Sequence, residues 1–122
     1  MRFGIDLDGT VFEYTKEPFS YSPTEMRAIP FPGCIKILND LLDKGHEVHI
    51  YTCRMNPTME SNKPYSVEQL REFVVKHLDK HGIPYTSISE YKPVCDYYLD
   101  DRNIAFSTWA DFEKLLQEAE MI

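Results

Sequence analysis

Acidic residues occur in two close pairs that could bind a metal ion or act as nucleophiles. Asp6 and Asp8 lie two residues apart at the end of an apolar segment, and Asp100 and Asp101 follow another. Brought together, four carboxylates would repel, since two like charges about 4 Å apart cost about 4 kcal/mol at an effective dielectric constant of about 20. The cluster therefore indicates a bound cation, and a set of ligands that is all oxygen suits Mg²⁺.

Thr52 and Lys92 lie where they could complete a site for phosphoryl transfer. Thr52 follows an apolar segment, and Lys92 lies in the loop that leads toward Asp100. A carboxylate can attack phosphorus and form an aspartyl-phosphate. Phosphoryl transfer further requires that the phosphate be positioned and its charge neutralised, which Lys92 and a metal ion could do.

The elements that must position these residues alternate between strands and helices. Alternating apolar residues predict strands at residues 2–7, 46–51, 85–89 and 97–99. Apolar residues at helical spacing predict three helices: one from about Ile35 to Lys44, a second that starts at Ser66 with a capping box to Gln69, and a third that starts near Thr108. Gly82 is expected to end the second helix, and residues 11–32 and 54–65 are expected to be loops.

This order of elements predicts an α/β fold, a single Rossmann-like domain over residues 1–122 with a parallel sheet and helices on both faces. The carboxyl ends of parallel strands share one edge of the sheet, where open α/β folds bind their ligands. If the first strand is central, between the second and the last, the polar residues above converge at that edge.

The same residues carry a resemblance to a known family. Residues 3–10, with the run Asp6-Leu7-Asp8-Gly9-Thr10, resemble the first motif of the haloacid dehalogenase (HAD) superfamily of phosphohydrolases. Thr52, Lys92 and the Asp100-Asp101 pair resemble its second, third and fourth motifs, in the family's order. The resemblance spans roughly residues 2–106.

The resemblance implies a Mg²⁺-dependent phosphatase that hydrolyses a phosphate monoester. Asp6 would be the nucleophile, and Asp8 would protonate the leaving group and then activate water. Thr52 would donate a hydrogen bond to a phosphoryl oxygen, and Lys92 would steady the nucleophile and the phosphate. The metal ligands would be Asp6, the backbone carbonyl of Asp8, and Asp100 or Asp101.

Two features depart from the family's commonest pattern. Lys92 lies only four residues before Asp96, which leaves little room for the helix that often carries this lysine. Neither long loop is large enough to be a cap domain, so the chain is similar to the capless members. Specificity would then rest on residues 11–32, whose aromatic side chains could equally pack the loop down.

Composition and charge exclude other classes of protein. The net charge of −7 disfavours generic nucleic-acid binding, so the expected substrate is a phosphorylated small molecule or macromolecule, with nucleic acid the less favoured choice. No apolar run approaches the length of a membrane span, and Asp6 and Asp8 lie where a signal peptide would need an apolar core. We therefore expect a soluble, cytoplasmic protein.

Cysteine and histidine spacing indicates no zinc or disulfide framework. Cys34, Cys53 and Cys95 are far apart and odd in number, so we expect reduced residues near the core. His77 and His81 are four residues apart on one helix face, but without a third ligand nearby we expect surface residues rather than a metal pair.

Two alternatives from other classes remain open on the sequence. One is a catalytically weak relative that binds phosphate or plays a regulatory role, against which the intact Asp6 and Asp8 argue. The other is a phospho-acceptor switch. In receiver domains the acidic pair comes first and the phosphorylated Asp ends a middle strand, an order that differs from the one found here.

Overall fold

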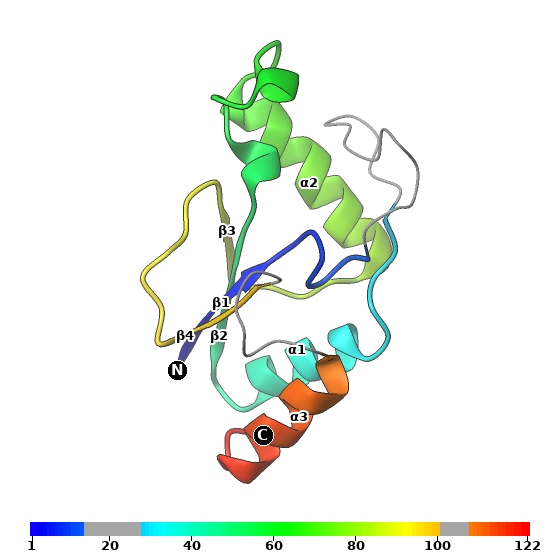
Figure 1. Ribbon diagram of the computed structural model, residues 1–122, viewed down its shortest axis with the longest axis vertical. Helices are drawn as coiled ribbons and strands as arrows, with labels where there is room; N and C mark the ends of the chain where they lie inside the picture. The colour runs from blue at the N-terminus through cyan, green and yellow to red at the C-terminus, as the bar shows by residue number, and fades with distance from the viewer. Residues whose placement is uncertain (14–27, 101–107) are drawn as a thin grey trace.

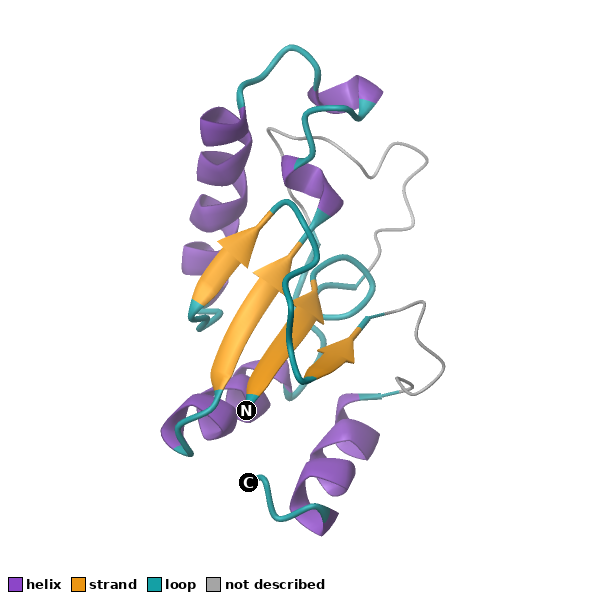
Figure 2. Cartoon of the chain, turned by 90° about the vertical axis from the view of Figure 1, so that its left-hand side faces the viewer, coloured by secondary structure: helices purple, strands orange, loops and turns teal. Residues whose placement is uncertain are grey.

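The chain forms a four-stranded parallel sheet with helices, which confirms the predicted α/β, Rossmann-like fold (Figure 2). The computed structural model describes residues 1–13, 28–100 and 108–122. The strands lie in the order β3-β2-β1-β4. Their bounds are β1 Arg2–Asp6, β2 Glu47–Tyr51, β3 Ser87–Ser89 and β4 Tyr97–Leu99.

The first strand lies between the second and the last, which is the condition under which the sequence predicted that the polar residues converge. Ile5 of β1 lies opposite Ile50 of β2 on one side and Leu99 of β4 on the other. Asp6, the last residue of β1, lies opposite Tyr51, the last residue of β2. The carboxyl ends of these strands therefore form one edge of the sheet.

The three α-helices begin and end close to where the sequence predicted. They are α1 Cys34–Asp43, α2 Val67–His81 and α3 Trp109–Glu118. Ser66 and Gln69 form the predicted capping box of α2. Gly82 closes that helix with φ of 67°, a left-handed conformation that glycine adopts at little steric cost.

The two faces of the sheet differ in polarity. Phe3, Ile5, Val48 and Ile50 are buried, and the register of β1 and β2 puts them on one face of the sheet. Phe3 contacts Phe112 of α3, and α1, α2 and α3 lie along one side of the sheet in Figure 1. The loop 90–96, drawn in yellow in Figure 1, runs along the opposite side of the sheet. Apolar burial is thus concentrated between the sheet and the helices. The prediction of helices on both faces was wrong for the described residues, because β1, β2 and β3 follow one another in one direction across the sheet, so the right-handed crossovers through α1 and α2 fall on the same side.

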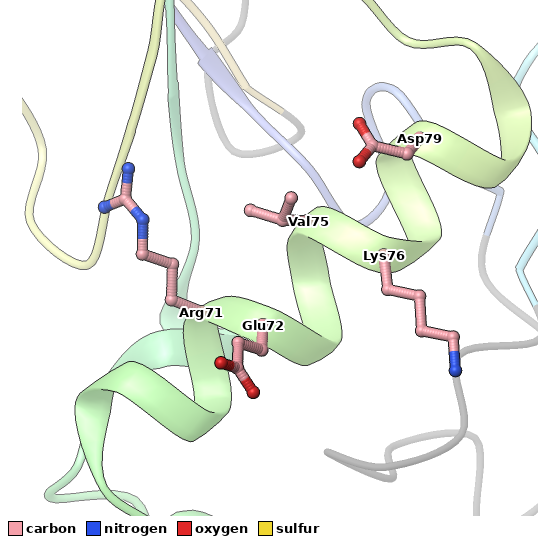
Figure 3. A pocket seen from close by; sticks show the side chains of 5 residues that line it. All are labelled: Arg71, Glu72, Val75, Lys76 and Asp79. Carbon is pink, nitrogen blue, oxygen red and sulfur yellow. The ribbon is translucent and has the colours of Figure 1, made fainter.

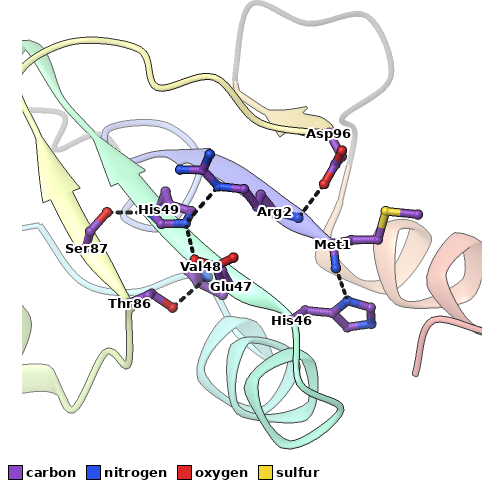
Figure 4. Close-up of polar contacts among 9 residues, drawn as sticks. All are labelled: Met1, Arg2, His46, Glu47, Val48, His49, Thr86, Ser87 and Asp96. Atoms are coloured by element: carbon purple, nitrogen blue, oxygen red, sulfur yellow. Dashed lines mark hydrogen bonds and ion pairs between the residues drawn. The ribbon is translucent and has the colours of Figure 1, made fainter.

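The opposite face carries polar side chains that contact one another (Figure 4). His49 is buried there, hydrogen-bonds Ser87 through Nδ1, and has its Nε2 3.2 Å from Glu47 Oε1. The backbone N–H of Arg2 donates to Asp96 Oδ2 over 2.7 Å. This last bond ties the end of loop 90–96 to the central strand.

The segment expected to be a polar loop after β2 contains two short 3₁₀-helices. They are η1 Cys53–Met55 and η2 Glu60–Asn62. The buried Asn62 side chain donates to the carbonyls of Cys53 and Asn56, at 3.2 and 2.8 Å. The side-chain amide of Asn62 therefore holds together the first residue of η1 and the residue that follows its last.

Two expectations about individual residues were wrong. His77 is 6% exposed and donates from Nε2 to the carbonyl oxygen of Ala28 at 2.9 Å, because α2 packs that side of its surface against Phe12 and Ala28. Cys53 is exposed rather than near the core, because η1 buries Arg54 and Met55 instead, whereas Cys34 is buried and Cys95 half-buried. All three thiols are free.

No helix within residues 1–13, 28–100 and 108–122 is long and apolar enough to cross a membrane.

Candidate active site

Most of the predicted site residues lie at or just beyond the carboxyl edge of the sheet. Asp6 is the last residue of β1, while Thr52 and Asp100 directly follow β2 and β4. Lys92 lies in the loop that follows β3. Asp101 lies outside the described residues.

The chain after Asp6 folds into a tight turn that brings Asp8 back over this edge. The carbonyl of Leu7 accepts hydrogen bonds from the backbone N–H groups of Thr10, Val11 and Phe12. Gly9 has a φ of 79°, a backbone conformation that residues with a Cβ atom rarely adopt. The turn is anchored from the other end of the chain, because Trp109 Nε1 donates to the Thr10 carbonyl over 2.7 Å.

Arg54 binds Asp8, an interaction that the sequence did not suggest. Its Nε donates to Oδ1 and Oδ2 of Asp8 over 3.0 and 2.9 Å. The side chains are 7% and 20% exposed, so the pair is largely shielded from water. The only signal in the sequence was that Arg54 lies two residues after Thr52, close to the end of a predicted strand.

Thr52 is held with its hydroxyl proton free to donate elsewhere. Its backbone N–H donates to the carbonyl of Ser89, and its Oγ1 accepts from the backbone N–H of Arg54 at 3.2 Å. The residue is 2% exposed. A threonine hydroxyl can donate as well as accept, so Thr52 can present an O–H to a ligand oxygen.

Asp100 is contacted by a hydroxyl and by a cation. Tyr51 Oη donates to Asp100 Oδ2 over 2.9 Å, and Lys92 Nζ lies 3.7 Å from the same oxygen. Burial, the hydrogen bond to Asp100 and the negative charges of Asp100 and Asp6 raise the pKa of the Tyr51 hydroxyl. Tyr51 therefore remains a neutral donor at physiological pH.

Lys92 is positioned by a tyrosine rather than by a helix. Its Nζ lies 4.3 Å from the centre of the Tyr98 ring, within range of a cation–π contact. The Tyr98 hydroxyl donates to the Pro93 carbonyl and accepts from the Cys95 backbone N–H at 2.9 Å. One side chain of β4 thus fixes the loop and supports the lysine that it carries.

Cys53, which directly follows Thr52, is a neighbour of the site. Its thiol pKa is raised, first by partial desolvation and then by the carboxylates of Asp8 and Asp6. The thiolate form is therefore disfavoured, and a nucleophilic role for Cys53 is not indicated.

The oxygen donors of this edge are suited to a magnesium ion. Asp6 and Asp100 follow neighbouring strands, and Mg²⁺ in enzymes commonly uses one or two carboxylates together with water and substrate phosphate. In the described part of the chain, His, Cys, Asp and Glu side chains form no group of three or more that could hold a metal.

A hollow elsewhere on the surface is separate from this edge. It has a volume of about 540 Å³ and runs along α2 (Figure 3). Its lining side chains alternate in charge and include none of the predicted site residues: Arg71, Glu72, Val75, Lys76 and Asp79.

Comparison with known proteins bears on the fold. No protein-family model matches the chain, and no curated protein matches it. The crystal structure of a target protein from Vibrio cholerae is similar over 97% of this chain and 98% of its own, with a TM-score of 0.51 and 23% sequence identity. At that level of identity the likeness concerns architecture, and it supports the α/β fold described above.

Proposed function

We propose that this protein is a Mg²⁺-dependent phosphatase that hydrolyses a phosphate monoester through an aspartyl-phosphate on Asp6. The observation that carries the proposal is the arrangement of Asp6, Thr52 and Asp100 at the ends of three adjacent parallel strands, with Lys92 Nζ 3.7 Å from Asp100. Further support comes from the order of these residues in the chain, which resembles the motif order of HAD phosphohydrolases.

In the first step a carboxylate oxygen of Asp6 attacks phosphorus, and the bond between phosphorus and the leaving oxygen breaks. Asp8 gives its proton to that oxygen, while the Thr52 hydroxyl and Lys92 stabilise the phosphoryl oxygens. In the second step water attacks the phosphoryl group and Asp8 takes its proton. The Asp6–phosphorus bond then breaks, which releases phosphate and restores both carboxyl groups.

Asp6 and either Asp100 or Asp101, with the Asp8 carbonyl, would hold the magnesium ion. When bound, the ion would supply positive charge that offsets the repulsion between the phosphate and the carboxylates. The substrate is expected to be a phosphorylated small molecule or protein, because the acidic chain disfavours nucleic acid.

The direct test compares Asp6→Asn with wild type on an aryl phosphate in the presence of Mg²⁺. We expect the variant to lose phosphate release while it retains its circular dichroism spectrum and melting temperature. Mass spectrometry of rapidly quenched wild type should detect one added phosphoryl group, absent from the variant. Asp43→Asn, at an exposed aspartate at the end of α1, is the matched control and should stay fully active.

If Asp6→Asn releases phosphate as fast as wild type, Asp6 is not the nucleophile and the proposal fails. Activity in neither protein across a panel of phosphate esters would favour a second candidate, a phosphate-binding protein with little or no turnover. In that case the contacts of both Asp8 carboxylate oxygens with Arg54 would have a structural role rather than a catalytic one. Calorimetric binding of inorganic phosphate would then identify this second candidate.

A further inference from the structure

Arg54 contacts the proposed acid and base of the reaction directly. Its Nε lies 3.0 and 2.9 Å from the two carboxylate oxygens of Asp8, which is 46 residues away in the chain. With side-chain exposures of 7% and 20%, neither partner is freely solvated. A carboxylate held by such a pair is restricted in its rotation, because turning the group would break both contacts.

The backbone around Arg54 is itself held in place. The N–H of Arg54 donates to Thr52 Oγ1, and the preceding carbonyl, that of Cys53, accepts from the Asn62 side chain. The following residue, Met55, is fully buried. Arg54 therefore extends from a fixed short helix, and its guanidinium reaches Asp8 from a defined direction.

The same short helix links two proposed functional groups. Thr52 caps η1 and is proposed to bind the phosphoryl group, while Arg54 within η1 binds the proposed acid and base. A planar guanidinium can hold a carboxylate in a set orientation, which a lysine ammonium cannot do as well because it acts as a point charge.

We propose that Arg54 is a positioning residue that sets the orientation of the Asp8 carboxyl group for proton transfer with the leaving group and with water. This rests on the proposed phosphatase function and adds a residue to it. In this role Arg54 does not touch the substrate, and its substitution acts through Asp8.

The test measures phosphate release from an aryl phosphate and an alkyl phosphate by wild type, Asp8→Asn, Arg54→Lys, Arg54→Gln and the double variant Asp8→Asn/Arg54→Gln. An alkyl leaving group needs the proton from Asp8 more than an acidic aryl leaving group does. We expect both Arg54 variants to lose up to ~100-fold on the alkyl phosphate, as misplaced catalytic groups do, and clearly less on the aryl phosphate. The double variant should be no slower than Asp8→Asn alone.

Arg54→Lys keeps the positive charge, and it remains informative if Arg54→Gln folds poorly. Melting temperatures of all variants separate loss of fold from loss of positioning. Lys63→Gln is the matched control, since Lys63 pairs with Glu60 in the same segment but is 58% exposed. It should behave as wild type on both substrates.

Equal losses on the two substrates, or a double variant whose losses multiply, would show that Arg54 acts independently of Asp8 and would overturn the positioning role. Failure of the phosphatase proposal looks different. In that case Asp6→Asn is as active as wild type, or wild type is inactive, and the positioning role falls with it.

Discussion

Two acidic residues at the sheet edge, Asp8 and Asp100, are each met by a positively charged side chain of the protein itself. Arg54 binds Asp8, and Lys92 lies near Asp100. The two pairs differ in burial, since Lys92 is 53% exposed whereas Arg54 is 7% exposed. Water therefore weakens the pair of Lys92 and Asp100 far more than the pair of Arg54 and Asp8. In the proposed reaction Lys92 would turn toward the bound phosphate while Asp8 stays paired with Arg54.

Buried His77 gives the fold a dependence on pH. Burial lowers its pKa, the hydrogen bond to Ala28 opposes that shift, and the nearby positive groups His81, Lys80 and Arg54 lower the pKa further. The unfolded chain therefore binds a proton at a higher pH than the folded one does. Stability is greatest above the unfolded pKa of about 6.5 and falls as the pH drops from that value through the folded pKa.

We expect His77→Gln to flatten this loss of stability, because glutamine can keep a donor near the Ala28 carbonyl without titrating. Urea unfolding at a series of pH values between 7 and 5 gives the free energy of unfolding of both proteins as a function of pH. If the free energy of unfolding changed with pH by the same slope in wild type and variant, His77 would not be the source of the pH dependence.

At the scale of elements, the close packing of β1 against β4 fixes the position of Tyr98, the side chain that contacts Lys92. A Cβ added at Gly4 in β1 would lie 2.6 Å from the Tyr98 ring, closer than carbon atoms can approach. Tyr98 cannot move freely, since its hydroxyl bonds to the loop that carries Lys92. Glycine at this position therefore makes room for the side chain that supports the lysine.

Gly4→Ala should displace Tyr98 and with it Lys92, and so lower phosphatase activity by about tenfold or more, as shifts of catalytic groups do. The measurement is kcat on an aryl phosphate together with the melting temperature. Gly45→Ala is a control for the cost of replacing a glycine, because an added Cβ there meets nothing within 4 Å although φ is 84°. A Gly4→Ala protein with the kcat of wild type would show that the position of Tyr98 does not affect catalysis, and would contradict this prediction.

For the whole molecule, one face of the sheet carries the apolar core and the other carries the loop with Lys92 (Figure 1). The proposed site lies at the edge between them, reached by residues from both sides. In the proposed reaction a magnesium ion would be held by carboxylates together with water and substrate phosphate, as Mg²⁺ commonly is, and such an ion should exchange readily.

Removal of metal should therefore abolish activity reversibly. We expect EDTA to stop phosphate release by wild type and excess Mg²⁺ to restore it fully, without a change in the circular dichroism spectrum. EDTA saturated with Mg²⁺ beforehand is the control and should not inhibit. Activity that persists after dialysis against EDTA would contradict a metal-dependent reaction.

The sequence by itself determined the elements and the residues at their ends. Alternation marked the strands, the capping box of Ser66 and Gln69 marked the start of α2, and acidic or hydroxyl side chains followed β1, β2 and β4. Each of these signals is local, because it depends on neighbours along the chain.

Only the tertiary structure decided which partner each side chain meets. The pairing of Arg54 with Asp8, the burial of His77 against Ala28 and the bond from Trp109 to the Thr10 carbonyl join residues 46 to 99 positions apart. Burial and charge pairing depend on which surfaces come together in space, and no periodicity along the chain specifies that. The sequence therefore identified the strand ends where a site could form, while packing selected the groups that hold it.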